Sequence, residues 1–357
     1  MDPKISLGIS SVIVILVIAS SMFHNLPLGN ANNITDAASN VLRIGYFPNL
    51  NHAQAVIGLE NGDFQKTLLK DGITVEPHVF SAGPSVIEAL FANQIDVAYI
   101  GPNPAINGYM VSDGKDLRII AGAASGGAVF VVRDDLVIKS PKDFTGKKFA
   151  SPQLGNTQDI SLRSYLLRIG HKTKENGGDV EVISANMPDI LTLFLKKQID
   201  GAWVPEPWGS ILVKEANGRI FLDERTIWPD GKFVTANIVA RTDYLKSNSE
   251  TINKLLRFHV DETLWINYHK DLAIQTFNSG LKKLTGKTIP QDELRQAWSR
   301  IEFTYDPIKS SLLKLANDAY DLGFLVKGKE QQPGLSGIYD LTVLNNVLKE
   351  KGLNTIF

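Results

Sequence analysis

Residues 94–100 read QIDVAYI, and residues 198–204 read QIDGAWV, an offset of 104 positions. Two further matches lie upstream, in the same order and at nearly the same offset. The pair Ser-Ala at 81–82 recurs at 184–185, and PNLNHAQ at 48–54 corresponds to PQLGNTQ at 152–158. Self-similarity at a fixed spacing indicates two copies of one structural unit. The sequence therefore predicts an internal repeat.

Each copy alternates short apolar runs with helical patterns, in the order strand, helix, strand, helix, strand. The first copy is predicted to have strands at 42–46, 74–80 and 97–100, with helices at 53–64 and 85–93. The second copy is predicted to have strands at 148–150, 180–183 and 202–204, with helices at 159–168 and 189–197. This alternation predicts a mostly parallel sheet covered on both faces. The expected fold class is α/β, with two similar Rossmann-like lobes.

Two similar extended segments connect the copies. VVRDDL at 131–136 leaves the first copy, and VARTDYL at 239–245 follows the second. We interpret both as crossover strands, which gives a lobe 1 of residues 41–131 and 240–357 and a lobe 2 of residues 132–239. After them, Ser247 to Glu250 form a capping-box sequence, and a helical C-terminal part is expected. Two lobes joined by two strands can close around a ligand by a hinge.

The N-terminal segment indicates where the chain works. Residues 5–23 carry no charge, which is typical of a signal peptide or a membrane anchor, so we assign residues 1–23 to that role. Residues 24–40 are rich in Asn and small residues and are predicted to be a flexible tether. The rest of the chain is expected to be extracytoplasmic, in the periplasm or at the outer cell surface.

The composition argues against several classes of protein. The 37 Lys and Arg residues balance 38 Asp and Glu residues, so the chain lacks the basic excess typical of nucleic-acid binders. The absence of cysteine removes disulfides, thiolate zinc sites and cysteine nucleophiles. No GxSxG, HExxH or GxGxxG motif occurs. We therefore expect a monomer with no cofactor, no metal and no catalytic residue.

The candidate ligand site lies at the carboxyl ends of the predicted strands, where ligands of parallel α/β sheets bind. Seven loops occupy these positions, at 47–52, 81–85, 101–105, 123–127, 151–158, 184–188 and 205–209. They contain no Asp, Lys or Arg, and Glu206 is their one glutamate. Such residues also suit ordinary helix capping, so the case for a ligand rests on the recurrence over seven loops.

Backbone N–H groups at helix starts carry partial positive charge, so these loops favour a small anionic ligand. The predicted ligand-binding residues of lobe 1 are Asn49, Asn51, His52, Gly83, Pro84, Ser85, Gly101, Asn103, Ser125 and Gly126. Those of lobe 2 are Gln153, Asn156, Thr157, Glu206 and Trp208. His52 and Asn156 occupy equivalent repeat positions, as do Asn49 and Gln153, so each pair is expected to approach one ligand from opposite sides.

Glu206 has three candidate roles: contact with a ligand amine or metal, a structural acceptor for backbone N–H groups, or a solvated helix cap. The structural acceptor is favoured, because an unpaired carboxylate is unfavourable in a desolvated anion site. Trp208 is placed for a ligand contact, whereas Trp203 and Tyr99 share a strand position and are predicted to be core residues.

The same motifs resemble a known family. LRIGY at 42–46, QIDVAYIG at 94–101 and DGAWVPEPW at 200–208 resemble the solute-binding proteins of ABC importers, in the aliphatic sulfonate, taurine and nitrate branch. The resemblance runs from about residue 41 to residue 270. It implies the type II periplasmic-binding-protein fold, delivery of ligand to a membrane permease, and ligand contacts from the loops named above. It covers ligands as different as sulfonates, nitrate, bicarbonate and pyrimidine precursors.

Other functions stay open at this point. YFPN at 46–49, followed by His52, also resembles the binders of thiamine-pyrimidine precursors. An enzyme on the same fold would need a reactive His or Lys in the cleft, where only His52 is available. A sensory module would need a cytoplasmic output domain.

Overall fold

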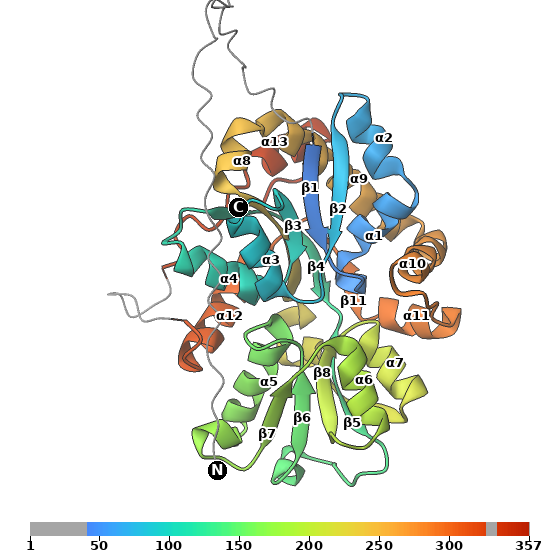
Figure 1. Ribbon diagram of the computed structural model, residues 1–357, viewed down its shortest axis with the longest axis vertical. Helices are drawn as coiled ribbons and strands as arrows, with labels where there is room; N and C mark the ends of the chain where they lie inside the picture. Colours follow the sequence, from blue (N-terminus) through green and yellow to red (C-terminus); the bar gives the residue numbers. More distant parts are fainter. Residues whose placement is uncertain (1–40, 326–333, 357) are drawn as a thin grey trace, which may run out of the picture. The chain divides into compact units, whose positions relative to one another are not determined.

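The computed structural model describes residues 41–325 and 334–356, which form two β-sheets with their helices (Figure 1). The predicted signal or anchor segment and the tether lie outside the described residues. The six-stranded sheet contains β1 (Val41–Tyr46), β2 (Thr74–Val79), β3 (Val97–Ile100), β4 (Leu117–Gly126), β10 (Val234–Arg241) and β11 (Ile301–Phe303). The five-stranded sheet contains β5 (Ala128–Arg133), β6 (Lys148–Ser151), β7 (Glu181–Ser184), β8 (Gly201–Pro205) and β9 (Gly218–Asp223).

The two sheets have the same strand order. The first reads β2-β1-β3-β10-β4 and ends with β11, and the second reads β7-β6-β8-β5-β9. In each sheet three strands run parallel, and the next one, β10 or β5, pairs antiparallel. These antiparallel strands arrive from the other sheet, since β5 follows β4 and β10 follows β9. The sheets are therefore mixed, and the prediction of mostly parallel sheets was wrong.

The chain changes sheets at two places. The first is Gly127, and it follows Gly126; their φ angles of 74° and 75° favour glycine at both positions. The second is the segment between Asp223 and Val234. Both places lie a few residues before the expected boundaries at 131/132 and 239/240. The division of the chain into two lobes stays a prediction.

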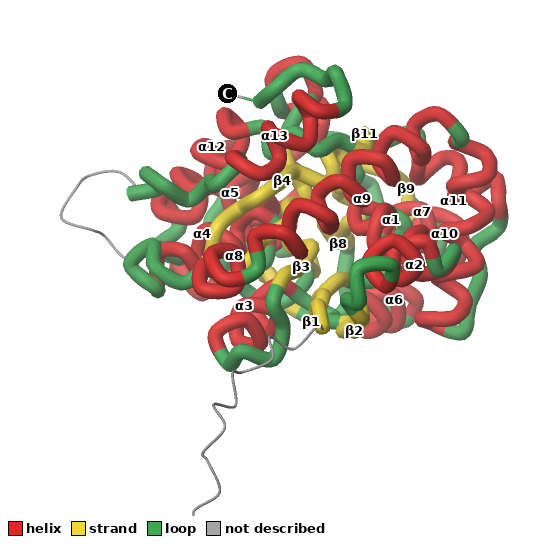
Figure 2. Tube along the Cα trace, turned by 90° about the horizontal axis from the view of Figure 1, so that it is seen from above, coloured by secondary structure: helices red, strands yellow, loops and turns green. Residues whose placement is uncertain are grey.

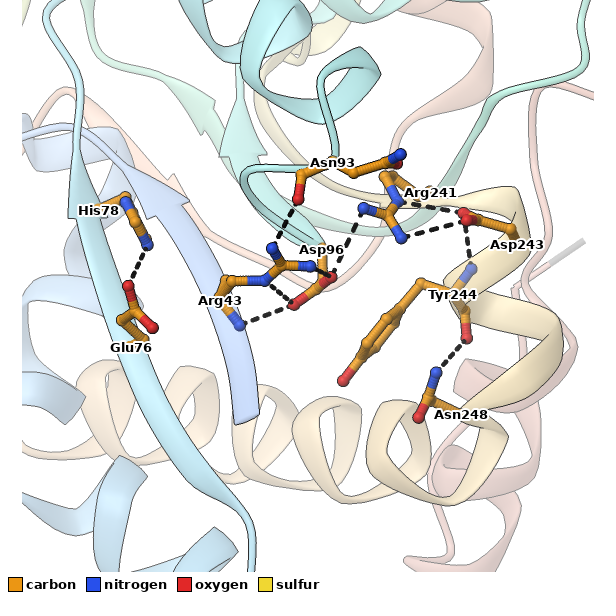
Figure 3. Close-up of polar contacts among 9 residues, drawn as sticks. All are labelled: Arg43, Glu76, His78, Asn93, Asp96, Arg241, Asp243, Tyr244 and Asn248. Carbon is orange, nitrogen blue, oxygen red and sulfur yellow. Dashed lines mark hydrogen bonds and ion pairs between the residues drawn. The ribbon is translucent and has the colours of Figure 1, made fainter. Parts of the chain in front are cut away.

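The repeated QID motif has the same structural role in both copies. Asp96 is buried before β3, and its carboxylate accepts hydrogen bonds from the Arg43 backbone N–H at 2.9 Å and from the Arg43 guanidinium at 2.6 Å and 3.0 Å. Arg241 lies 3.8 Å from the same carboxylate (Figure 3). Asp200, the equivalent residue, accepts from the Lys148 N–H at 2.8 Å. Each aspartate thus ties the start of one strand to its neighbour, at the end of the sheet away from the predicted site.

Helices cover both faces of the six-stranded sheet (Figure 2). One face packs against α1 (Ala53–Glu60), α2 (Asp63–Leu69), α8 (Thr242–Ser247), α9 (Ser249–Tyr268), α10 (Lys270–Thr285), α11 (Gln291–Trp298) and α13 (Thr342–Glu350). The other face packs against α3 (Gly83–Phe91), α4 (Pro102–Val111) and α12 (Lys309–Asp321).

The five-stranded sheet is also covered on both faces. Val129 and Val131 of β5 pack on the side of α6 (Met187–Leu195) and α7 (Trp208–Glu215). Phe130 and Val132 pack on the side of α5 (Thr157–Arg168), because successive strand residues point to opposite faces. Short 3-10 turns complete the structure: η1 (Leu50–His52), η2 (Pro141–Phe144), η3 (Lys174–Asn176), η4 (Glu224–Ile227) and η5 (Pro229–Gly231).

Some predicted elements differ from the observed ones, because local backbone geometry, rather than the pattern of apolar residues, determines where a helix begins or ends. The helix predicted at 53–64 divides at Gly62, whose φ of 68° ends α1 before α2 begins. The predicted capping box is absent: Asn248 is the N-cap of α9, and its side chain makes no capping hydrogen bond. Within residues 41–325 and 334–356, no helix combines the length and apolar character that a membrane span requires.

Candidate ligand-binding site

A narrow cavity of about 20 Å³ lies between the two sheets, at the carboxyl ends of their parallel strands. Residues near the six-stranded sheet that line it are Phe47, Asn49, Asn51, His52, Ser81, Gly101 and Thr235. Those near the five-stranded sheet are Pro152, Asn156, Thr157, Gln158, Met187 and Pro205. Asp, Glu, Lys and Arg are absent from this lining among the residues that the structure describes. The cavity wall is therefore polar without a fixed charge.

Four helices begin at this cavity. His52, Gly101 and Asn156 are the N-cap residues of α1, α4 and α5, and Met187 is the first residue of α6. The first N–H groups of a helix have no partner within the helix and concentrate its positive partial charge. These helix starts bring positive partial charge towards the cavity, although its lining has no formal charge; some of their N–H groups already have partners, such as the Asn103 N–H with Thr157 Oγ1 and the Ala53 N–H with the Leu50 carbonyl oxygen.

Six of the predicted ligand-binding residues line the cavity: Asn49, Asn51, His52, Gly101, Asn156 and Thr157. The equivalence of His52 and Asn156 is visible in the structure, because each is the N-cap of the first helix of its copy. In the other expected pair, Asn49 lines the cavity, whereas Gln153 is exposed and does not line it. That these residues bind a ligand stays a prediction.

The remaining predicted residues of the first copy lie around the cavity or away from it. Gly83 and Ser85 are in the first turn of α3, and a Cβ atom on Gly83 would stand 3.3 Å from Asn156 Oδ1. Pro84 and Asn103 line a neighbouring pocket of about 300 Å³.

A loop was predicted at 123–127, and this prediction was wrong for Ser125 and Gly126. They belong to β4, where Ser125 pairs with both Val234 and Glu302. The Ser125 hydroxyl accepts a hydrogen bond from the Phe233 N–H at 3.2 Å. The strands that pair with β4 come from distant parts of the chain, so no local pattern indicated the pairing. Without that information, the Ser and Gly residues at 125–127 are typical of a loop.

A larger groove adjoins the cavity. It has a volume of about 820 Å³ and shares Phe47, Asn49, Ser81 and Met187 with the cavity lining. Trp208 lines this groove, and its indole Nε1–H donates to Asn49 Oδ1 at 3.2 Å. Much of its wall is apolar, from α6, α7 and α10: Leu191, Leu195, Ile211 and Leu281. Trp208 thus lies beside the cavity, and its contact with a ligand stays a prediction, whereas Tyr99 and Trp203 are fully buried core residues, as predicted.

Hydrogen bonds join the two sides of the cavity. Besides the contact of Trp208 with Asn49, the Leu50 N–H donates to the Glu206 carbonyl oxygen at 3.1 Å. The Asn103 N–H donates to Thr157 Oγ1 at 3.4 Å. Approach at this point is close, because a Cβ atom on Gly101 would stand only 2.5 Å from Thr157 Oγ1. The structure thus has the two sides in contact.

Glu206 does not line the cavity. It is fully buried, and its carboxylate accepts hydrogen bonds from Arg300 Nη1 at 2.9 Å and from the Ser210 N–H at 2.9 Å. Burial raises the pKa of Glu206, and the Ser210 N–H and Arg300 oppose that shift. These contacts agree with the favoured structural role. Arg300 lies 94 positions away in the sequence, so no local pattern indicated the pairing.

His52 is the one titratable side chain in the cavity lining within the described part of the chain. Burial lowers its pKa to about 3, so the imidazole is neutral near pH 7. A group with so low a pKa is a weak base. Elsewhere among the described residues, no three acidic or histidine side chains gather as a metal site.

Sequence reasoning missed part of the cavity lining. Phe47, Ser81, Pro152, Gln158, Met187 and Pro205 lie in loops that were identified but were not singled out. Thr235 lies in no predicted loop; it is on β10, and its hydroxyl donates to the Gly126 carbonyl oxygen at 2.8 Å. The available signal was a pair of polar residues, Thr235 and Asn237, alternating with apolar residues in this strand.

Comparison with known proteins gives a consistent result. The sequence model of the NMT1-like family matches residues 36–277. A binding protein of Brucella abortus is 28% identical over 217 residues, which cover 60% of this chain and 63% of that protein. The taurine-binding periplasmic protein of Escherichia coli is 24% identical over 192 residues, 54% of this chain and 57% of that one. The chain therefore matches less than two thirds of the length of these curated relatives.

Solved structures resemble the fold at low sequence identity. The alkanesulfonate-binding protein SsuA from Xanthomonas axonopodis, bound to MOPS, has a TM-score of 0.68 and 17% identity, covering 81% of this chain and 95% of that one. The periplasmic nitrate-binding protein NrtA from Synechocystis has a TM-score of 0.70 and 16% identity, covering 88% of this chain and 89% of that one. These likenesses show a periplasmic-binding-protein fold with mixed sheets and many helices.

Proposed function

Because the chain belongs to the NMT1-like family, we propose that it is an extracytoplasmic solute-binding protein of an ABC importer. It captures a small anionic solute between two lobes and delivers it to the membrane permease. The candidate ligands are sulfonates, taurine, nitrate and bicarbonate.

The observation that carries this proposal is the meeting of four helix N-termini at one cavity without charged side chains. Each N-terminus carries about half a positive charge and stabilises a nearby anion by roughly 0.3–1 kcal/mol, more where the site is partly buried. Four of them can hold an anion without a lysine or arginine. A neutral wall also avoids the strong attraction of a salt bridge, which suits a carrier that must release its ligand.

Closure of two lobes follows from the same arrangement. The matching strand orders and the two places where the chain changes sheets support a type II periplasmic-binding-protein fold, with Rossmann-like lobes joined by two crossover segments. The contacts of Trp208 with Asn49 and of Asn103 with Thr157 would break on opening and reform on closing. A hinge at Gly127 and between Asp223 and Val234 would allow that motion.

We expect the protein to bind its ligand without changing it. The cavity offers His52, whose pKa near 3 makes it a poor general base, and two of the relatives described above are named for binding taurine and nitrate. A binder of a thiamine-pyrimidine precursor is the alternative, and the groove of about 820 Å³ beside the cavity gives it room. The monomeric state and the permease partner belong to the same proposal.

Thermal unfolding tests the proposal. The melting temperature should rise with ethanesulfonate, taurine, nitrate or bicarbonate at constant ionic strength, by an amount that grows with the logarithm of concentration. Sodium chloride at the same ionic strength is the control and should give no such rise. If none of these four compounds raised the melting temperature, the proposed function would be wrong. A ligand recovered chemically altered would place the protein among enzymes.

A further inference from the structure

Two side chains in the cavity have a buried polar atom without a partner. His52 and Asn51 are 0% and 5% exposed, and both line the cavity of about 20 Å³. Among the described residues, neither His52 Nε2 nor Asn51 Oδ1 has a hydrogen-bond partner. Buried polar atoms are nearly always hydrogen-bonded in folded proteins, so this pair requires an explanation.

The contacts of His52 determine whether its unpartnered Nε2 is a hydrogen-bond donor or an acceptor. The Phe47 N–H donates to His52 Nδ1 at 3.3 Å, so Nδ1 is the acceptor nitrogen of the ring. A neutral imidazole then carries its proton on Nε2. The low pKa of His52 agrees with that neutral form. His52, which lines the cavity, therefore has an N–H donor without a partner among the described residues.

The contacts of Asn51 decide its orientation in the same way. Its Nδ2 donates to the Thr235 carbonyl oxygen at 3.2 Å. The reverse orientation would place two oxygen atoms against each other, because a carbonyl cannot donate. Asn51, which also lines the cavity, therefore has a carbonyl acceptor without a partner among the described residues.

One donor and one acceptor in a cavity this small define a narrow class of occupants. A volume of about 20 Å³ is enough for roughly one oxygen-sized group. Nitrate and unsubstituted sulfonates can accept from His52 but cannot donate to Asn51. An ammonium group can donate, but the described lining has no carboxylate to compensate its charge. A hydroxyl oxygen, whether it belongs to water or to a ligand, can accept from His52 and donate to Asn51 at once, and a ligand hydroxyl would take the place of such a water.

We propose that this cavity is a hydroxyl subsite, in which a ligand O–H accepts a hydrogen bond from His52 Nε2 and donates one to Asn51 Oδ1. The proposal rests on the proposed function and narrows it to anions that also carry a hydroxyl group. The anionic group would lie at the mouth of the cavity, close to the helix N-termini, where the adjoining groove of about 820 Å³ shares Phe47, Asn49, Ser81 and Met187 with the cavity lining.

Two matched pairs of ligands test the proposal by isothermal titration calorimetry on the full chain. The first pair is 2-hydroxyethanesulfonate and 1-propanesulfonate, which have the same charge and nearly the same size but differ in one hydroxyl. The second is bicarbonate and nitrate, which are both planar anions and differ in one O–H. The hydroxyl-bearing member should bind about 10-fold more tightly, because it satisfies both buried atoms.

An Asn51→Leu variant tests the assignment of the acceptor. It removes Oδ1, together with the Nδ2 group that donates to Thr235, and keeps the number and branching of the side-chain heavy atoms, so the preference should fall to about 2-fold or less. Gln54→Met is the matched control, because Gln54 also has a buried carbonyl oxygen without a partner but does not line the cavity. That variant should keep the full preference.

The outcomes separate the two proposals. Equal binding of both members of each pair by the wild-type protein would overturn the hydroxyl subsite and leave the anion-binding function intact. Absence of binding by all four anions would overturn both. A preference that persists undiminished in Asn51→Leu would overturn the role of Asn51. The comparison of ligands on the wild-type protein decides the question even if the variant does not fold.

Discussion

Replacing Gly101 by alanine should weaken ligand binding by holding the two sides of the cavity apart. The backbone of Gly101 has φ −65° and ψ 154°, so alanine fits there without strain. The added Cβ, however, would stand 2.5 Å from Thr157 Oγ1, whereas ordinary contacts begin at 3.4 Å. Relieving this contact requires a shift of about 0.9 Å, the difference between these distances, either by rotation of the Thr157 side chain away from the Asn103 N–H or by separation of the two sides.

The size of the effect follows from the cost of overpacking. Inserting a methyl group into a well-packed contact typically costs about 1–3 kcal/mol. If this cost applies only to the closed, ligand-bound state, the affinity for the ligand is roughly 5- to 150-fold lower. The stability of the ligand-free protein should change less, because the clash is relieved when the two sides move apart.

Calorimetric titration with 2-hydroxyethanesulfonate measures the effect, and Thr157→Ala provides the control. Thr157→Ala removes the clashing Oγ1. In the double variant, the Cβ of residue 157 would lie 3.5 Å from the methyl group of Gly101→Ala, which is an ordinary contact distance. Adding Gly101→Ala to Thr157→Ala should therefore cost little further affinity. Wild-type affinity in Gly101→Ala would refute the reasoning, as would an equal loss in the presence and absence of Thr157 Oγ1.

Three further predictions follow from other contacts. Arg300→Leu should lower the free energy of unfolding in urea by about 3–5 kcal/mol, because it leaves the Glu206 carboxylate buried without its partner. Adding Glu206→Gln should recover most of that loss, and a loss below about 1 kcal/mol would contradict the structural role of the pair. Asn156→Ala should weaken anion binding by roughly 10- to 100-fold with the fold intact, and unchanged affinity would remove Asn156 from the site. The folded-state pKa of His52, about 3, lies below its ordinary value of 6.5, so the unfolded chain binds more protons between these values. Stability should therefore fall as the pH drops from about 6.5 towards 3, by up to about 1.4 kcal/mol per pH unit from His52, and His52→Gln should show a shallower fall in urea unfolding.

Local pattern predicted the repeated units well. The strand at 97–100 matches β3 at both ends, and the equivalence of His52 and Asn156 holds because both copies place a helix N-cap after their first strand. The repeated aspartates, Asp96 and Asp200, explain why QID recurs, since each ties a strand start in the same way.

Long-range pairing could not be predicted in the same way. β4 is held between β10 and β11, so Ser125 is a strand residue although its neighbours in sequence are those of a loop. Glu206 pairs with Arg300, and Arg300 lies outside the stretch of sequence that carries the family resemblance. Thr235 reaches the cavity because β10 returns from the other sheet. In each case the deciding partner is distant in sequence.

We expect one small anion to bind between the two sheets, at the cavity and the groove that adjoins it. Native mass spectrometry of the full chain tests it most directly, with 2-hydroxyethanesulfonate, taurine, nitrate and bicarbonate added in turn. We expect one bound probe molecule per chain for at least one of these probes, and we expect the complex to be lost in the Asn156→Ala variant. No complex with any probe, or an equally abundant complex in the Asn156→Ala variant, would contradict it.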